Sequence, residues 1–150
     1  MNSDFAPVHD PDPDPVNDRY GHVAAVWHEV TLLWGGAKPE RGNINFKSPW
    51  DPAVVLRHQD GVWTSKTTYG QVPPPLFGAA AEVVGNNLYV MCGVVRVDKT
   101  KTNDIYKLDL ISWTWSKLDP KGTKLLRSAH MRSWVCGERI FLFGGWGGPW

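Results

Sequence analysis

Two Arg-x-x-His motifs are the first candidates for chemistry in this sequence. Arg19 is followed by His22, and Arg127 is followed by His130. An arginine presents several N–H donors in a fixed fork, and a histidine can donate or accept a hydrogen bond. Such a pair suits either hydrogen bonds inside the fold or the binding of a ligand. We expect hydrogen bonding within the fold, with ligand binding as the alternative.

Motifs for catalysis and metal binding are missing from the sequence. The five histidines show no metal-ligand spacing beside a carboxylate or a thiolate, and no Gly-x-Ser-x-Gly motif occurs. Asp10, Asp12 and Asp14 alternate as in a calcium loop, but Pro15 stands where an EF-hand needs glycine. We therefore expect no enzyme activity, no cofactor and no bound metal.

Composition and charge give the class of protein. The 150 residues carry a net charge of +1 and include 15 glycines, 12 prolines and 9 tryptophans, a mixture that suits short strands joined by turns. This charge favours neither nucleic acid nor an anionic membrane. Cys92 and Cys136 form no C-x-x-C pair and indicate a reducing compartment. Without a signal sequence or a long apolar run, the chain is expected to be cytosolic or nuclear.

A short apolar run that ends in glycine occurs three times. The runs close at Gly35-Gly36, at Gly93 and at Gly144-Gly145, with closing glycines 57 (93 − 36) and 52 (145 − 93) residues apart. A period near 50 residues indicates a repeat architecture. The paired glycines suit a positive φ and a close backbone approach at a strand end. Phosphate binding is the alternative, but the sequence after Gly144 does not match the G-x-G-x-x-G pattern.

Each repeat is expected to contain four strands. Asp60-Gly61 stands between two β-prone runs and predicts a type I′ hairpin turn. Trp63 and Trp115 fall at similar places in their repeats and are expected to pack between neighbouring sheets. A basic loop with Arg96 and other cationic residues follows Gly93. The expected strands cover residues 22–27, 30–34, 53–58, 62–67, 79–84, 88–92, 104–108, 114–118 and 140–143.

The repeats define the organisation of the chain. Residues 1–18 form an acidic, proline-rich leader in which we expect disorder and neither helix nor sheet. The units that follow cover about residues 19–75, 76–125 and 126–150. The last unit lacks its two outer strands.

The order Arg-x-Gly-His, an apolar run ending in Gly-Gly, and a tryptophan such as Trp115 resembles the kelch repeat over residues 19–147. The resemblance implies an all-β fold, a partial kelch β-propeller of about two and a half four-stranded blades. The second unit departs from the pattern, since Leu76 and Ala79 replace arginine and histidine and Cys92 replaces the first glycine.

Within kelch proteins, the chain is similar to the group without BTB and BACK domains. That group includes substrate receptors of cullin-RING ubiquitin ligases that capture protein C-terminal tails. By motif position, the resemblance implies a partner-binding pocket formed by Tyr20, Arg127, Ser128, His130 and Trp146. In it Arg127 would pair with a carboxylate and Trp146 would form a wall. The structural residues are expected to be Gly35, Gly36, Trp63, Gly93, Trp115, Gly144 and Gly145.

The expected function is therefore that of a protein-interaction module. The alternatives are a kelch enzyme or specifier protein that acts on a small molecule, and a fragment without independent function. An open arc of blades leaves apolar faces and strand edges in water, so self-association is also expected.

Overall fold

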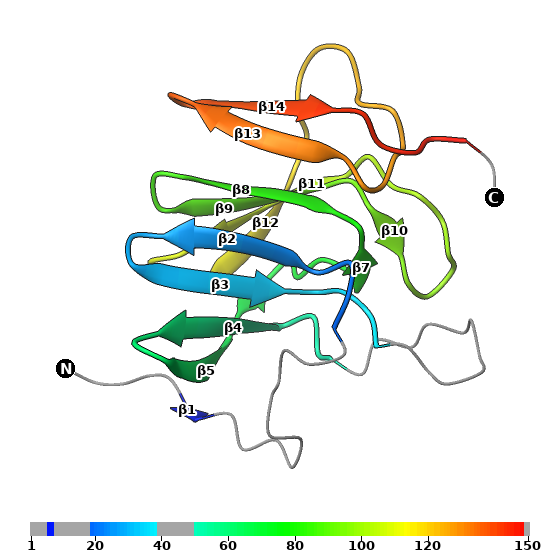
Figure 1. Cartoon of the computed structure of the whole chain (residues 1–150). Coiled ribbons are helices and arrows are strands. Elements are labelled where there is room, and N and C mark those ends of the chain that lie inside the picture. Colours follow the sequence, from blue (N-terminus) through cyan, green and yellow to red (C-terminus); the bar gives the residue numbers. More distant parts are fainter. Residues whose placement is uncertain (1–5, 8–18, 39–49, 149–150) are drawn as a thin grey trace.

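The computed structural model describes residues 6–7, 19–38 and 50–148. The described residues are all-β, and among them no helix is long and apolar enough to cross a bilayer. Figure 1 shows the strands as a stack of small sheets, whose strands pair antiparallel except for the short parallel pair of Tyr69–Gly70 with Thr114–Leu118. The strands are β1 (Ala6–Pro7), β2 (Val23–Trp27), β3 (Val30–Trp34), β4 (Val54–Gln59), β5 (Val62–Thr67), β6 (Tyr69–Gly70), β7 (Leu76–Phe77), β8 (Ala80–Val84), β9 (Asn87–Met91), β10 (Val94–Val95), β11 (Ile105–Asp109), β12 (Thr114–Leu118), β13 (Arg132–Cys136) and β14 (Arg139–Phe143).

The sheets are the blades of a partial β-propeller. Blade 1 has the order β2-β3-β4-β5 with β1 added outside β5, and blade 2 has the order β8-β9-β11-β12 with β6 added outside β12. The strands β13 and β14 form a half-blade. The inner strand β8 contacts both β2 and β13, so the three units are stacked side by side (Figure 1). The predicted fold class is confirmed.

Local sequence signals set the strands and their turns. The strands β3, β5 and β12 have the predicted bounds, and the other strands of the two blades begin or end within one residue of them. Asp60 and Gly61 have φ angles of 52° and 79°, so the predicted turn with two positive φ values is confirmed. The turn is closed by the Gln59–Val62 pair of β4 and β5.

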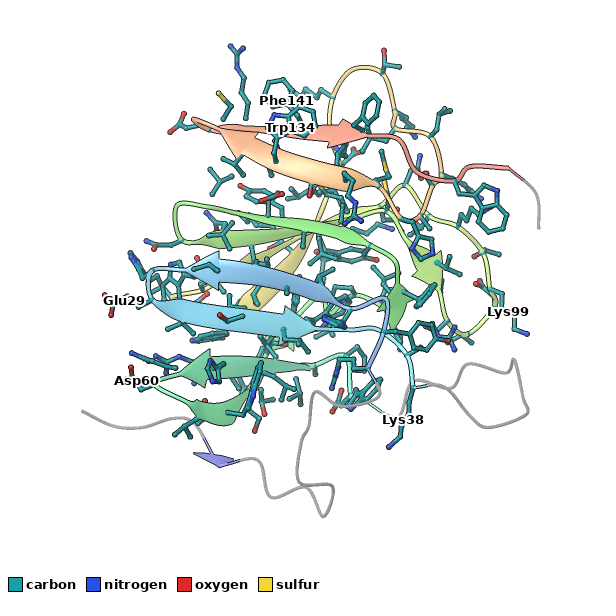
Figure 2. All side chains as sticks on the ribbon, in the orientation of Figure 1. Glu29, Lys38, Asp60, Lys99, Trp134 and Phe141 are labelled. Carbon is teal, nitrogen blue, oxygen red and sulfur yellow. The ribbon has the colours of Figure 1, made fainter. Side chains whose placement is uncertain are left out.

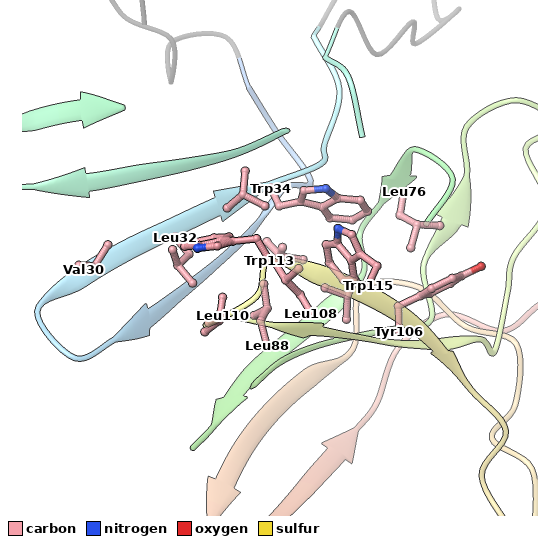
Figure 3. Packing of buried hydrophobic residues seen from close by; sticks show 13 residues of the cluster. Val30, Leu32, Trp34, Leu76, Leu88, Tyr106, Leu108, Leu110, Trp113 and Trp115 are labelled. Atoms are coloured by element: carbon pink, nitrogen blue, oxygen red, sulfur yellow. The ribbon is translucent and has the colours of Figure 1, made fainter. Parts of the chain in front are cut away.

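The main core lies between blades 1 and 2. Trp34 and Trp115 are each 1% exposed, and their ring centroids are 5.6 Å apart (Figure 3). The Nε1–H of Trp115 donates to Thr68 Oγ1 over 2.9 Å. The polar edge of each indole is therefore satisfied inside the core, since Trp34 Nε1 donates to the Pro52 carbonyl over 2.7 Å.

Trp63 is placed differently from Trp115. It lies opposite His58 across β4 and β5, on the face of blade 1 that points away from blade 2, with ring centroids 4.8 Å apart. The two tryptophans occupy equivalent strand positions, but within the described residues only Trp115 has a neighbouring blade to pack against.

A smaller cluster joins blade 2 to the half-blade. Met91 and Cys92 are buried there, and Ile140 and Leu142 pack against them. The alternate residues of β14 point away from blade 2, which leaves Phe141 and other apolar side chains exposed. In the described part of the chain, blade 2 therefore covers one face of the half-blade.

The leader contributes one short strand. Ala6 and Pro7 pair with Ser65 and Thr64 at the outer edge of blade 1. We expected no sheet in residues 1–18, and this expectation does not hold at these two positions. An edge strand tolerates proline because its missing donor costs no ladder hydrogen bond on the open side. The other leader residues, including Asp10, lie outside the described residues.

Candidate partner-binding rim

Loops from all three units meet at one end of the strands. The hairpin turns of the blades lie at the left in Figure 1, and the segments that carry β7 and β10 lie at the right, at the end where β3, β9 and β14 finish. At that end, the residue that follows each diglycine position pairs with a residue that precedes an inner strand. The three pairs are Tyr20 with Ala37, Phe77 with Val94, and Ala129 with Trp146.

The glycines at this end allow the blades to approach each other. The N–H of Gly36 donates to the Leu76 carbonyl of the next unit over 2.9 Å, and the N–H of Gly93 donates to the Ser128 carbonyl over 2.8 Å. A Cβ at Gly36 would lie 2.8 Å from the carbonyl oxygen of Tyr20. The positive φ angles are 69° at Gly35, 90° at Gly36, 102° at Gly93, 72° at Gly144 and 89° at Gly145. Gly36 and Gly93 therefore make backbone contacts between units, and the positive φ favours glycine at all five positions.

Arg19 stands at the start of this region in blade 1. Its guanidinium donates to the Gly35 carbonyl over 2.7 Å and lies 3.6 Å above the centroid of the Trp50 ring. Burial lowers the pKa of Arg19 to about 10. Burial and the Arg19 charge also lower the pKa of His22. The first Arg-x-x-His motif therefore hydrogen-bonds inside its own blade.

A row of aromatic rings crosses from blade 1 to the half-blade. The ring centroids of Tyr20 and Phe77 are 5.1 Å apart, and those of Phe77 and His130 are 5.0 Å apart, both edge to face. The guanidinium of Arg96 lies 5.9 Å from the centre of the Phe77 ring. Burial lowers the pKa of Arg96 and raises the pKa of Tyr20, and the Arg96 charge opposes the second shift. A half-buried cation thus stands beside the rings.

Lys101 adds a second cation near the half-blade. Its side chain is 9% exposed, its ammonium lies 3.8 Å from the centroid of the Trp146 ring, and it donates to the Gly148 carbonyl. Such a cation–π contact stabilises both groups when they are partly desolvated. We use "the rim" for the whole set, which is Arg19, Tyr20, Phe77, Arg96, Lys101, His130 and Trp146.

The predicted pocket residues are only partly brought together. Tyr20 and His130 stand in the ring row, and Trp146, 40% exposed, covers Lys101. Ser128 is 5% exposed; its hydroxyl packs against Gly145 of the same unit, and its carbonyl accepts the hydrogen bond from the Gly93 N–H of blade 2. Arg127 is exposed, and its side chain takes part in none of the rim contacts described above.

We expected Arg127 and His130 to hold the places of Arg19 and His22, and this alignment is wrong by one residue. The His130 N–H donates to the Gly78 carbonyl over 2.7 Å, as the Gly78 N–H donates to the Gly21 carbonyl over 2.8 Å. His130 therefore takes the place of Gly78 and Gly21, and its φ of 58° matches their values of 63°. Consequently Ser128, and not Arg127, occupies the position of Arg19. Backbone pairing sets this register, and residue type does not.

Three rim residues were missed by motif position, namely Phe77, Arg96 and Lys101. The basic loop after Gly93 was the available signal for the two cations. The sequence does not show that this loop lies beside the ring row. That position depends on the pairing of β10 with β7, which brings Val94 and Val95 against Phe77 and Leu76. Among the described residues, no group of three or more His, Cys, Asp or Glu is placed to hold a metal ion.

Known proteins match the chain over most of its length. Residues 8–149 match the KLHDC2/KLHL20/DRC7 Kelch-repeats domain. Kelch domain-containing protein 3 of Homo sapiens is 30% identical over 127 residues, which cover 85% of this chain and 32% of that protein. Kelch domain-containing protein 2 of Homo sapiens is 30% identical over 136 residues, which cover 87% of this chain and 33% of that protein.

The chain thus spans about a third of the length of the curated relatives that it matches. The glycine-closed strand pairs and four-stranded blades agree with the matched domain. The chain therefore belongs to the Kelch-repeats domain family and forms part of a kelch β-propeller.

Proposed function

We propose that the rim binds the C-terminal tail of a partner protein, and that the chain is part of a substrate-recognition domain of a cullin-RING ubiquitin ligase. As a kelch-repeat domain, the chain is a protein–protein interaction module. The proposal concerns binding alone, without chemistry carried out by the chain, in the cytoplasm or the nucleus.

The half-buried guanidinium of Arg96, 5.9 Å from the centre of the Phe77 ring and beside the ring row, is the observation that carries the proposal. Burial lowers its pKa because a charge removed from water lacks hydration. An anionic group that enters the rim would be attracted to this charge, and a carboxylate matches the guanidinium fork. Tyr20 and Phe77 would pack against the apolar part of the same ligand.

The charges around Arg96 are consistent with an anionic ligand. The rim contains Arg19, Arg96 and Lys101 and no acidic residue. The nearest acid in the sequence, Asp98, accepts hydrogen bonds from the backbone and the hydroxyl of Thr100, over 3.0 Å and 2.6 Å. The Asp98 carboxylate therefore already accepts two hydrogen bonds within its own loop.

The test compares peptides that differ in one terminal group. The protein is incubated with a pool of random decapeptides that have free C-terminal carboxylates and with the same pool amidated, and retained peptides are quantified by mass spectrometry. We expect retention of the carboxylate pool, and a loss of about tenfold in affinity for Arg96→Gln, which is about 1.4 kcal/mol. Arg139→Gln is the matched control, because Arg139 is exposed at the hairpin-turn end of β14.

Equal retention of both pools, or equal losses in the two variants, would contradict carboxylate recognition at the rim. The ligase assignment has its own test in cells. A reporter that ends in a retained tail should become longer-lived when the full-length protein is depleted, and an unchanged lifetime would contradict that assignment.

A further inference from the structure

The two ends of the strands differ in charge. The hairpin turns at one end are residues 28–29, 60–61, 85–86, 110–113 and 137–138. They contain Glu29, Asp60 and Glu138, and neither lysine nor arginine. Figure 2 shows Glu29 and Asp60 at this end of the strands, and Lys38 and Lys99 at the opposite end, where the rim lies. The hairpin turns are therefore acidic.

The loops at the rim end are basic. Their described residues include eight cations, which are Arg19, Lys38, Arg96, Lys99, Lys101, Lys121, Lys124 and Arg127. The same loops include four acids, which are Asp51, Asp98, Asp104 and Asp119. Asp104 forms an ion pair with Lys117 of β12 over 3.0 Å, so its charge is already balanced. This separation of charge attracts an anionic group to the rim end and repels it from the turn end.

The segment that joins β12 to β13 runs along the rim. The side-chain amide of Asn103 donates to the Leu125 carbonyl over 2.8 Å, and the Ser128 N–H donates to the Thr102 carbonyl over 3.4 Å. These bonds hold the segment beside the two residues that follow the rim lysine, Lys101. A ligand at the rim therefore has this segment next to it.

The segment presents two cations on either side of an apolar side chain. Lys124 and Arg127 are exposed, and Leu126 between them is 84% exposed. Among the described residues, neither of the two cations forms an ion pair. We call these three residues the basic ridge. It suits a peptide segment with carboxylate side chains, because its charges attract anions and its leucine offers apolar contact.

We propose that the tail bound at the rim is acidic, and that the carboxylate side chains before its last residues contact Lys124 and Arg127. The inference rests on the proposed function, in which the terminal carboxylate lies at Arg96. It adds a substrate class, namely tails with several Asp or Glu residues ahead of the terminal three. Because the ridge side chains are exposed, these contacts act mainly on the association rate and weaken as salt is added.

The test uses four pools of decapeptides with three random residues at the C-terminal end. The preceding seven positions are drawn from Asp, Glu, Gly and Ser in the acidic pool, and from Asn, Gln, Gly and Ser in the neutral pool. Each pool is made with a free and with an amidated C-terminus. We expect the free acidic pool to be retained about fivefold more than the free neutral pool, the effect of two exposed charge pairs.

Two double variants locate the preference. Lys124→Gln with Arg127→Gln should bring the ratio of acidic to neutral retention close to one. Lys107→Gln with Arg139→Gln removes the same two charges from β11 and from the hairpin-turn end of β14, and should leave the ratio unchanged. The ridge variant should still prefer free over amidated peptides, which shows that it is folded and that the rim is intact.

The outcomes separate this inference from the proposed function. Equal retention of the acidic and neutral pools, or the same fall in both double variants, would overturn the inference, even where free peptides are still preferred over amidated ones. Equal retention of free and amidated peptides, with the acidic preference lost in the ridge variant alone, would contradict the proposed function and keep the ridge as a site for acidic segments. Retention of none of the pools would overturn both.

Discussion

Replacement of Gly36 by alanine tests the close approach of the diglycine turn of blade 1 to the segment that precedes β2. Gly36 has a φ of 90°, and an added Cβ would lie 2.8 Å from the Tyr20 carbonyl oxygen and 3.0 Å from the His22 nitrogen. Gly61 is the matched control, with a φ of 79° and, among the described residues, no atom within 4 Å of an added Cβ. Both variants carry the same backbone strain, and only Gly36→Ala crowds a neighbouring segment.

The magnitudes separate the two variants. An alanine at positive φ costs about 1–2 kcal/mol, and the less flexible unfolded chain offsets about 0.4–1 kcal/mol of that. Gly61→Ala should therefore lower the free energy of unfolding by about 1 kcal/mol. Gly36→Ala adds about 1–3 kcal/mol for overpacking, because the crowded atoms are backbone. The Gly36 N–H bond to Leu76 is also displaced, so we expect a loss of about 3 kcal/mol in total.

Urea unfolding followed by tryptophan fluorescence measures the difference. Thermal unfolding should agree, with the midpoint lowered by about 3 °C for Gly61→Ala and about 9 °C for Gly36→Ala. Equal losses of unfolding free energy in the two variants would refute the reasoning. They would mean that the positive φ alone accounts for the loss, and that the close approach of the two segments contributes nothing.

Two further predictions concern the core and the acid response. Trp115→Phe should lower the free energy of unfolding by about 2 kcal/mol in urea titrations, because it leaves Thr68 Oγ1 without the indole donor and opens a void. Trp134→Phe, at a half-exposed position of β13, should lower it by less than about 0.5 kcal/mol. The reverse order of the two losses would contradict the assignment of Trp115 to the core. Burial lowers the pKa of His22 below 6.5, so the unfolded chain binds that proton more tightly and stability should fall as the pH drops below about 6.5. The fall, read from urea midpoints at pH 7.5 and 5.5, should shrink in His22→Asn but not in His28→Asn at an exposed turn, and identical falls in all three proteins would exclude His22 as its source.

Most of the fold could be read from the sequence because its signals are local. The run Val30–Trp34 between a turn and a diglycine is a strand wherever it is placed, and Asp60-Gly61 closes a tight turn by its own φ preference. The period near 50 residues then gives the number of units. Ala6–Pro7 escaped this reasoning, because an edge pairing of two residues depends on the partner strand β5 and not on local propensity.

The candidate site was less predictable, because it is assembled from several loops. Motif spacing found Tyr20, His130 and Trp146, each of which adjoins a diglycine turn or an inner strand. It also selected Arg127, which lies one residue before the position equivalent to Arg19. Spacing along the chain cannot detect such an offset, since the register between units is set by backbone hydrogen bonds across them.

The sequence by itself determined the repeat, the strands and the glycine-closed turns, since hydrophobic periodicity and glycine preferences act over a few residues. Only the tertiary structure decided which side chains meet. Stacking of the blades brings Arg96 to Phe77 and places Lys101 under Trp146. It also gives Trp115 a neighbouring blade, which Trp63 does not have among the described residues. These contacts join residues of different loops or blades, and their free energy depends on burial, which exists only once the blades are packed.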